Sequence, residues 1–322
     1  MTDPASDDPA SDEPASDEPA GRGPARAAGS GPAGTDGPGR AILRLPAALA
    51  GPAREVLSGR KEPVTPCDAA SVLLLRPAGL GGPGPAGIEV YMLRRAWSMA
   101  FAPGVSAFPG GSVDPRDAEE GMAWAGPDAQ EWGRALDAPA ALARALVCAA
   151  VRETFEESGV LLAGPSQAAV VADTSGPDWE ADRRALLDHS LSLAGFLGRR
   201  GLVLRSDLLR PWARWVTPVV EARRYDTRFF IAAIPSGQRT RHVGGEAKEV
   251  AWWQPDVAIA AARRRELRLM PPTAVCLAQV GACGQVDAAL QATRDLRPVI
   301  PGVVEDGGTL WLTTPLDLEY PL

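Results

Sequence analysis

The chain has 322 residues, of which 45% are hydrophobic, and its formal net charge is -7. The hydrophobic share is enough for a globular core, whereas the acidic balance argues against sequence-independent binding to nucleic acid, which needs a basic surface. No stretch approaches the roughly 18 consecutive apolar residues of a transmembrane helix. The acidic N-terminus does not resemble a secretory signal, and the four scattered cysteines do not form a disulfide framework. We therefore expect a cytoplasmic protein with reduced thiols.

The first part of the chain differs in composition from the rest. Residues 4–18 repeat the motif PASD(D/E), and residues 1–40 contain 8 acidic residues, 3 arginines, 7 prolines and 7 glycines. Such a segment cannot bury enough apolar surface to offset the entropy of ordering it. We predict a disordered acidic tail over residues 1–40 and a transitional leader over residues 41–66, with ordered structure beginning near Cys67.

Downstream of the leader, strand-like runs alternate with helical patterns. Residues 71–76 and 88–95 are rich in aliphatic residues on either side of a Gly/Pro-rich loop, which predicts two strands. Residues 141–159 carry apolar side chains at helical spacing and end at a glycine, which predicts a helix. The interleaving indicates one elaborated α/β-type domain. The further strands expected are 213–220, 227–234 and 249–253, and the further helices are about 179–199, 255–266, 271–280 and 284–296.

Three glutamates lie close together near the end of the helix predicted at 141–159. Glu153 and Glu157 are four residues apart, and Glu153 and Glu156 are three apart, so the three carboxylates share one helix face. They repel one another and oppose the helix macrodipole, which favours cations at a C-terminus. A hard divalent cation such as Mg²⁺ or Mn²⁺ would compensate this charge. A solvated acidic helix face is the alternative, and this helix alone does not decide between the two.

Upstream, the segment Phe108–Gly111 reads FPGG, and adjacent glycines let the backbone approach a ligand closely. Together with residues 152–160 it resembles the Nudix box, whose pattern is G-x5-E-x7-R-E-U-x-E-E-x-G-U, with U a bulky aliphatic residue. Thr154 stands at the first U, and Asp117 stands where the pattern has its first glutamate. Between Asp117 and Arg152 there are 34 residues where the pattern has 7, an insertion of 27. The matching positions are Gly111, Arg152, Glu153, Glu156, Glu157, Gly159 and Val160.

A split box of this kind resembles the Nudix branch that includes the mammalian peroxisomal coenzyme A diphosphatase. The stretches WVTP at 215–218 and LMPPT at 269–273 agree with that branch. Other coenzyme A-cleaving members carry an Arg-x-His signature before FPGG, and this signature is missing because Ala100 and Ala102 occupy its positions. Coenzyme A is therefore a lead about the substrate and not a conclusion.

The resemblance covers residues 67–322 and implies an α+β fold. The fold that it implies is a Nudix-type α/β/α sandwich with a mixed sheet and the box helix on one face. Helical insertions at about 118–142 and 165–210 would lie outside the core sheet and form a substrate lid.

The resemblance also implies an activity, the metal-dependent hydrolysis of a pyrophosphate bond in a nucleoside-diphosphate-linked small molecule. Coenzyme A or acyl-CoA is the favoured substrate. A nucleotide sugar, a dinucleotide or an oxidised nucleotide is the alternative for the same chemistry. A different class of function is a non-catalytic module that binds a nucleotide and regulates a partner. The sequence leaves the exact substrate and the oligomeric state open, and it indicates neither a nucleic-acid nor a membrane partner.

The same resemblance implies roles for individual residues. Mg²⁺ or Mn²⁺ would be held by Glu153, Glu156 and Glu157, with a backbone carbonyl of Gly110 or Gly111, while Arg152 would orient the carboxylates by ion pairing. Whether Asp117 reaches the metal is left open by its shorter side chain and by the insertion that follows it.

Two further roles depend on segments outside the box. The general base in relatives is a box glutamate or a glutamate in a later loop, where this chain has Glu246 and Glu249. We rank Glu249 higher because it directly precedes a predicted strand. Bidentate arginines suit substrate phosphates. The candidates for this role are Arg94, Arg95, Arg223 and Arg224.

Overall fold

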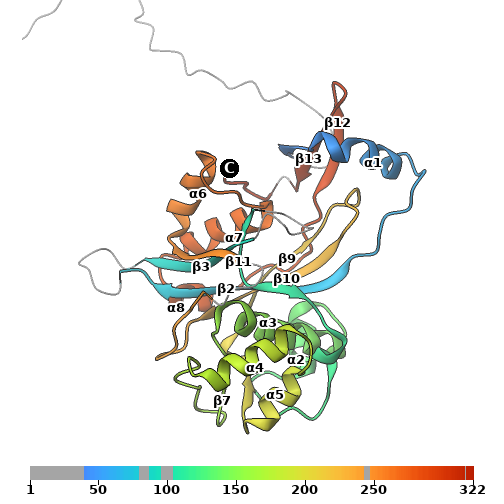
Figure 1. Cartoon of the computed structure of the whole chain (residues 1–322). Helices are drawn as coiled ribbons and strands as arrows, with labels where there is room; N and C mark the ends of the chain where they lie inside the picture. Colours follow the sequence, from blue (N-terminus) through green and yellow to red (C-terminus); the bar gives the residue numbers. More distant parts are fainter. Residues whose placement is uncertain (1–39, 80–86, 96–103, 243–246, 316) are drawn as a thin grey trace, which may run out of the picture. The chain divides into compact units, whose positions relative to one another are not determined.

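The structure is a computed structural model, and it describes residues 40–79, 87–95, 104–242, 247–315 and 317–322. The acidic tail predicted over residues 1–40 falls outside these ranges except for its last residue, and so do Ala100, Ala102 and Glu246. The described residues all belong to a single structural unit (Figure 1).

A mixed sheet forms the centre of this unit. Five strands pair in the order β11-β3-β2-β10-β9, β4 pairs with β3, and β5 pairs with β2. The pairing of β10 with β2 is parallel, with Phe230 opposite Val72, and the other pairings are antiparallel. The strands are β2 (Cys67–Pro77), β3 (Ile88–Arg95), β4 (Ser106–Ala107), β5 (Gly110–Ser112), β9 (Arg210–Val216), β10 (Tyr225–Ala233) and β11 (Ala247–Trp253).

Both faces of the sheet are covered by helices, because β2 is apolar on both sides. Val72 and Leu74 pack in a cluster with α3 (Ala140–Ser158). Leu73 and Leu75 point the other way, as alternation along a strand requires, into a second cluster that contains residues of α7. Figure 1 shows α2 to α5 on one side of the sheet and α6 and α7 on the other. The expected α/β/α sandwich with a mixed sheet is therefore confirmed. Beyond the sheet lie α6 (Pro255–Arg263), α7 (Pro271–Ala282) and α8 (Val286–Gln291).

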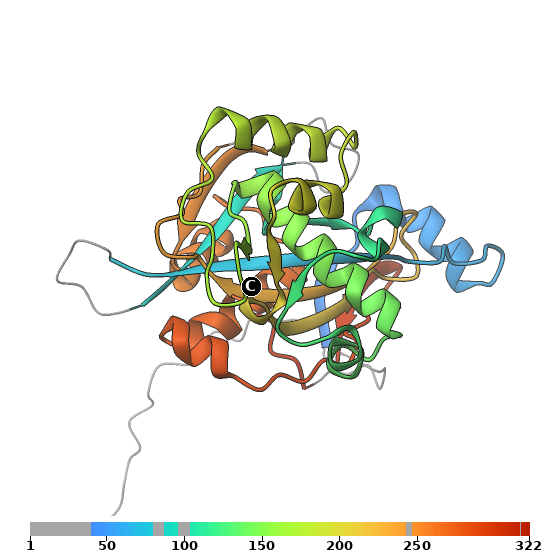
Figure 2. The same cartoon turned by 90° about the horizontal axis from the view of Figure 1, so that it is seen from below.

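The inserted segments form an additional layer on the outer side of α3. Phe155 of α3 stacks on Phe196 with ring centroids 5.2 Å apart, and Trp179 meets both rings edge-on. Figure 2, seen from below, shows these helices in front of the strands. The layer is packed into the core around α3, which differs from the lid expected from the sequence. It contains β6 (Trp124–Ala125), α2 (Ala129–Leu136), β7 (Ala163–Gly164), α4 (Pro177–Leu187), α5 (Leu193–Arg199) and β8 (Val203–Arg205), with short 3-10 turns η1 (Pro115–Ala118) and η2 (Ser206–Leu208).

The expectation that ordered structure begins near Cys67 is wrong. Strand β1 (Arg40–Arg44) and helix α1 (Ala47–Leu57) precede it, and β1 pairs with β13 (Thr309–Thr314), which pairs with β12 (Gly302–Asp306). The physical reason is long-range burial, because Leu45 and Ala53 pack with Leu310 and Leu312, which the chain supplies only at its other end.

Three other elements differ from their sequence predictions. The helix expected over 179–199 is two helices, α4 and α5, interrupted at His189, whose φ is 60°. The strand expected over 213–220 ends at Val216, before Pro218. The helix expected over 284–296 ends at Gln291, because the following segment is extended and Val299 pairs with Trp215 of β9.

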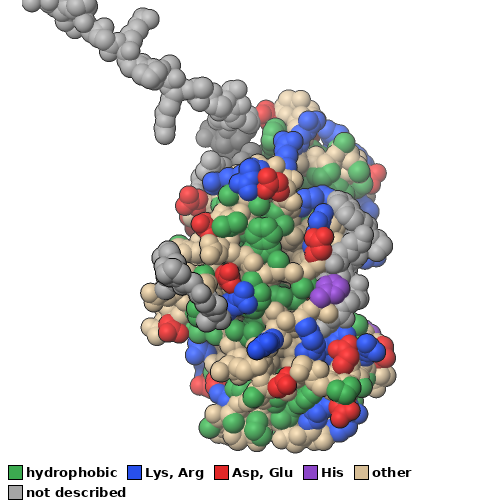
Figure 3. All heavy atoms as spheres, turned by 60° about the vertical axis from the view of Figure 1, so that its left-hand side comes forward, with side chains coloured by type: hydrophobic (Ala, Val, Ile, Leu, Met, Phe, Trp, Pro, Cys, Tyr) green, Lys and Arg blue, Asp and Glu red, His purple; other side chains and the backbone are tan. Residues whose placement is uncertain are grey.

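Charged side chains of both signs are interspersed on the face shown in Figure 3. Apart from its grey residues, this face therefore carries no extended basic surface of the kind that binds nucleic acid. None of the helices in the described ranges is long and apolar enough to cross a membrane.

Candidate active site

The box helix α3 carries a buried arginine at the centre of an acidic cluster. Arg152 is only 5% exposed. Its Nε and Nη2 donate to the two carboxylate oxygens of Asp117, both at 2.9 Å, so the pair is bidentate. Its Nη1 donates to Oε1 of Glu153 at 2.8 Å and to Oε1 of Glu156 at 3.3 Å. One guanidinium thus holds two carboxylates of its own helix, Glu153 and Glu156, together with that of Asp117, which lies 35 positions earlier in the chain.

Asp117 reaches Arg152 because of the turn that carries it. It lies in η1, where Asp114 caps the N-terminus and the carboxylate of Asp117 accepts a hydrogen bond from the Asp114 N–H at 2.8 Å. This reciprocal capping box fixes the side chain. The insertion therefore does not carry Asp117 away from the box helix, because both of its carboxylate oxygens accept from Arg152.

The two glycines of FPGG lie directly against this cluster. They form β5, which pairs with β2 through Gly110–Ser71 and Gly111–Ala70. A Cβ on Gly111 would lie 2.4 Å from Oε1 of Glu153, closer than side chains tolerate. The N–H of Gly110 donates to Oε2 of Glu157 at 2.8 Å. Glycine is needed here because the backbone itself contacts two box carboxylates.

The cluster carries more negative than positive charge in a buried setting. The pKa of Glu153 is raised to about 7, mainly by desolvation and also by Glu156 and Asp117, against the lowering by Arg152. Desolvation also raises the pKa of Glu156, against the lowering by Arg152. Burial of a charge without full compensation is costly. The site is therefore a place where an added cation would be stabilising.

The residues at this site fit a divalent cation by ligand type and by charge. Carboxylate oxygens are what Mg²⁺ and Mn²⁺ prefer, and the Gly111 backbone contacts Glu153 with no side chain between them. Within the described ranges, no three His, Cys, Asp or Glu side chains are gathered around one point as a preformed metal cluster. The carboxylates are gathered around Arg152 instead. The fit rests on donor chemistry, charge and the glycine contact, and not on a completed coordination shell.

Glu249 and Arg94, predicted as general base and phosphate ligand, lie beside each other on neighbouring strands. They are register partners in β11 and β3, and Nη1 of Arg94 donates to Oε2 of Glu249 at 3.2 Å. The side chains are 39% and 70% exposed. Alternation along β3 places Arg94 on the face of Val90 and Met92, opposite to Tyr91.

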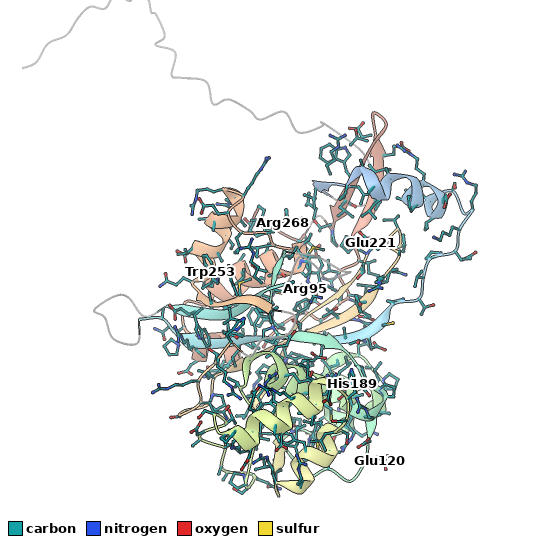
Figure 4. All side chains as sticks on the ribbon, viewed as in Figure 1. Arg95, Glu120, His189, Glu221, Trp253 and Arg268 are labelled. Carbon is teal, nitrogen blue, oxygen red and sulfur yellow. The ribbon has the colours of Figure 1, made fainter. Side chains whose placement is uncertain are left out.

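Arg95 lies where the FPGG segment and the α6–α7 connection meet. Its N–H donates to the carbonyl of Val105 at 3.0 Å, and the N–H of Ser106 donates to the carbonyl of Arg268 at 2.8 Å. Figure 4 labels Arg95 and Arg268 in the same central region. Arg268, an exposed residue, is absent from the sequence-based candidates because nothing in its local pattern links it to β4.

Arg223 and Arg224 occupy a turn before β10. Arg223 is exposed. Arg224 is buried and donates to the carbonyls of Thr217 at 3.0 Å and Val64 at 2.7 Å. The prediction that Arg224 binds substrate phosphate is therefore corrected, because its guanidinium joins two segments of main chain.

The fold and this site define the class of protein. A solved structure, a NUDIX hydrolase from Alicyclobacillus acidocaldarius, matches with a TM-score of 0.58 and 29% identity, covering 72% of this chain and 98% of that one. The family model described as the NUDT19 Nudix domain matches residues 122–280. In fold and in sequence, the chain is similar to proteins of the Nudix hydrolase superfamily.

Curated relatives place the chain near one branch of that superfamily. The acyl-coenzyme A diphosphatase NUDT19 of Gallus gallus is 29% identical over 248 residues, covering 64% of this chain and 65% of the relative. The human protein of the same description is 28% identical over 226 residues, covering 58% of each. The chain thus spans less than two thirds of the length of these two relatives.

Proposed function

We propose that this chain hydrolyses the pyrophosphate bond of a nucleoside-diphosphate-linked small molecule in a reaction that depends on Mg²⁺ or Mn²⁺. The observation that carries the proposal is the buried guanidinium of Arg152, which holds Asp117, Glu153 and Glu156 beside the Gly111 backbone. Three carboxylates around one guanidinium leave an excess of negative charge, which a divalent metal ion would compensate.

Each residue of the cluster has a proposed task. Glu153, Glu156 and Glu157 would hold the cation, with a backbone carbonyl of Gly110 or Gly111. When bound, the cation polarises phosphoryl oxygens and lowers the pKa of a bound water. Arg152 fixes the direction of the Glu153 and Glu156 carboxylates, and the Gly110 N–H fixes that of Glu157. In phosphoryl transfer such positioning supplies most of the catalysis.

Coenzyme A or acyl-CoA is the proposed substrate. The split box and the two acyl-coenzyme A diphosphatase relatives support it. Arg95 and Arg94 are proposed to contact the substrate phosphates, with Arg223 as a further candidate, and Glu249 is proposed as the general base. A nucleotide sugar, a dinucleotide or an oxidised nucleotide would use the same chemistry, and the substrate panel below separates them.

The test is a substrate panel with Mg²⁺ or Mn²⁺, with products identified by mass. The panel contains coenzyme A, an acyl-CoA, NADH, ADP-ribose and a nucleotide sugar. We expect coenzyme A to give 3′,5′-ADP and 4′-phosphopantetheine, and we expect Glu157→Gln to lose this turnover. Glu266→Gln is the matched control, since Glu266 is exposed and pairs with Arg264. Ligand-dependent thermal stabilisation without turnover by any substrate would instead support the regulatory module.

A further inference from the structure

The last turn of the box helix carries acidic side chains and main-chain carbonyl groups but no basic residue. The last turns of α3 carry Glu153, Glu156 and Glu157. The macrodipole already places partial negative charge there, and the last carbonyl groups lack partners within the helix. Arg152 orients the side-chain carboxylates of Glu153 and Glu156, but the main-chain carbonyl groups at the helix end need donors from outside α3.

Arg183 of α4 supplies the first donor. Its Nη1 donates to the main-chain carbonyl of Glu156 at 2.8 Å. The residue is 2% exposed, so this charge-assisted hydrogen bond is shielded from water. Glu156 is one of the box glutamates, and its own backbone is thereby tied to the inserted layer.

Arg241, in the connection between β10 and β11, supplies further donors to the end of α3. Its N–H donates to the carbonyl of Ser158 at 3.1 Å, and its Nη1 reaches the carbonyl of Gly159 at 3.5 Å. A Cβ on Gly159 would lie 2.5 Å from that Nη1. The box glycine therefore serves two purposes, since its φ of 75° ends the helix and its missing side chain admits the arginine.

The carboxylate of Glu180 hydrogen-bonds Arg183 and forms a longer ion pair with Arg241. Glu180 accepts from Nε and Nη2 of Arg183 at 2.9 and 2.7 Å, and it lies 3.8 Å from Nη2 of Arg241. Arg183 lowers the pKa of Glu180, so the carboxylate stays ionised. Tyr91 also lies at the end of the helix, where its single hydroxyl proton is shared between the carbonyl oxygens of Glu157 at 3.5 Å and Arg241 at 3.3 Å.

We propose that Arg183 and Arg241 are positioning residues for the metal-binding glutamates, acting by anchoring the C-terminal end of α3 from two segments outside the box. The role rests on the proposed metal-dependent function. The proposal also assigns a role to the insertion, because α4 holds in place the helix that carries the metal-binding glutamates. Residues that orient ligands from behind typically change metal affinity roughly 10- to 100-fold when they are removed.

The test is direct Mn²⁺ binding by calorimetry on the full chain, without substrate. We expect Arg183→Met to weaken Mn²⁺ binding about 10-fold and to raise the Mn²⁺ concentration for half-maximal activity equally, with kcat at saturating Mn²⁺ within about twofold. Arg184→Met is the matched control. Arg184 lies on the same helix and pairs with the same Glu180, but its side chain is 71% exposed. We expect it to bind Mn²⁺ like the unmodified chain.

Arg241→Met tests the same end of α3 from the other segment and serves if Arg183→Met fails to fold. Its side chain is 26% exposed, and we expect a weaker loss of about threefold in Mn²⁺ affinity. Unchanged Mn²⁺ affinity in a folded Arg183→Met or Arg241→Met would overturn the positioning role alone. An unmodified chain that binds no Mn²⁺ and hydrolyses no substrate would overturn the proposed function, and this role with it.

Discussion

Two arginine–carboxylate groups in this protein use the same chemistry in opposite surroundings. Arg152 and Asp117 have side chains that are 6% and 2% exposed, whereas Arg94 and Glu249 are 39% and 70% exposed. The buried guanidinium serves three carboxylates and a main-chain carbonyl, that of Ser112. The exposed guanidinium of Arg94 serves one carboxylate at 3.2 Å. Burial, and not ion pairing as such, distinguishes the group around Arg152, which fixes the positions of several side chains.

The physical reason is the cost of an unpaired charge. In water, an ion pair gains little and is screened by salt. In a dry interior, removing one partner leaves the other charges without compensation, which is strongly destabilising. The comparison predicts that mutations around Arg152 affect stability and activity together, while those at Arg94 affect at most substrate contact.

The largest expected effect is that of Arg152→Met. It leaves Asp117, Glu153 and Glu156 buried without their cation, so we expect a loss of roughly 3–5 kcal/mol in the free energy of unfolding. Urea denaturation measures it. Arg94→Met is the paired control and should cost less than about 1 kcal/mol. Equal losses in the two variants would break the comparison.

Nearly as large is the expected effect of Phe196→Ala, which probes the layer that covers the outer side of α3. Phe196 is fully buried and stacks on Phe155 of the box helix. Loss of a buried aromatic side chain costs about 3–5 kcal/mol, measured by the same denaturation. If the inserted layer were a detachable lid, the variant would unfold at nearly the urea concentration of the unmodified chain.

A pH effect should appear when the chain is studied with a chelator. Burial raises the pKa of Glu153 to about 7, above its value in the unfolded chain. The folded state therefore binds the proton more tightly, so the free energy of unfolding should fall as pH rises from about 4.5 to 7, by roughly 3 kcal/mol. Glu153→Gln should flatten this dependence, and Mn²⁺ should restore stability near pH 7. A flat profile in the unmodified chain would contradict the buried, undercompensated state of Glu153.

The smallest effect is expected from Gly111→Ala. Its Cβ would meet Oε1 of Glu153 at 2.4 Å and displace the carboxylate, costing about 1–2 kcal/mol and weakening stabilisation by Mn²⁺. Gly198→Ala is the control, since an added Cβ there meets nothing within 4 Å. Thermal unfolding with and without Mn²⁺ measures both. If Mn²⁺ raised the unfolding temperature of the two variants equally, Gly111 would have no role in the metal site.

The local sequence pattern correctly predicts elements that are determined by residues within their own segment. The predicted strand over 88–95 and the helix over 141–159 match β3 and α3 to within one residue, because hydrophobic spacing and a terminal glycine act locally. The split helix at 179–199 and the early strand β1 were missed. The first depends on a left-handed residue at His189, and the second on a partner strand near the other end of the chain.

For the candidate site, the sequence by itself determined that Arg152 and three glutamates share the end of one helix, because helical spacing is a local rule. Only the tertiary structure decided what surrounds them. It brought Asp117 across the insertion to Arg152, and it brought Arg183 and Arg241 to the carbonyls of the helix end. The contact between Arg241 and Gly159 joins residues 82 positions apart. The reason for these contacts is the burial of α3 between the sheet and the inserted layer, which no local pattern encodes.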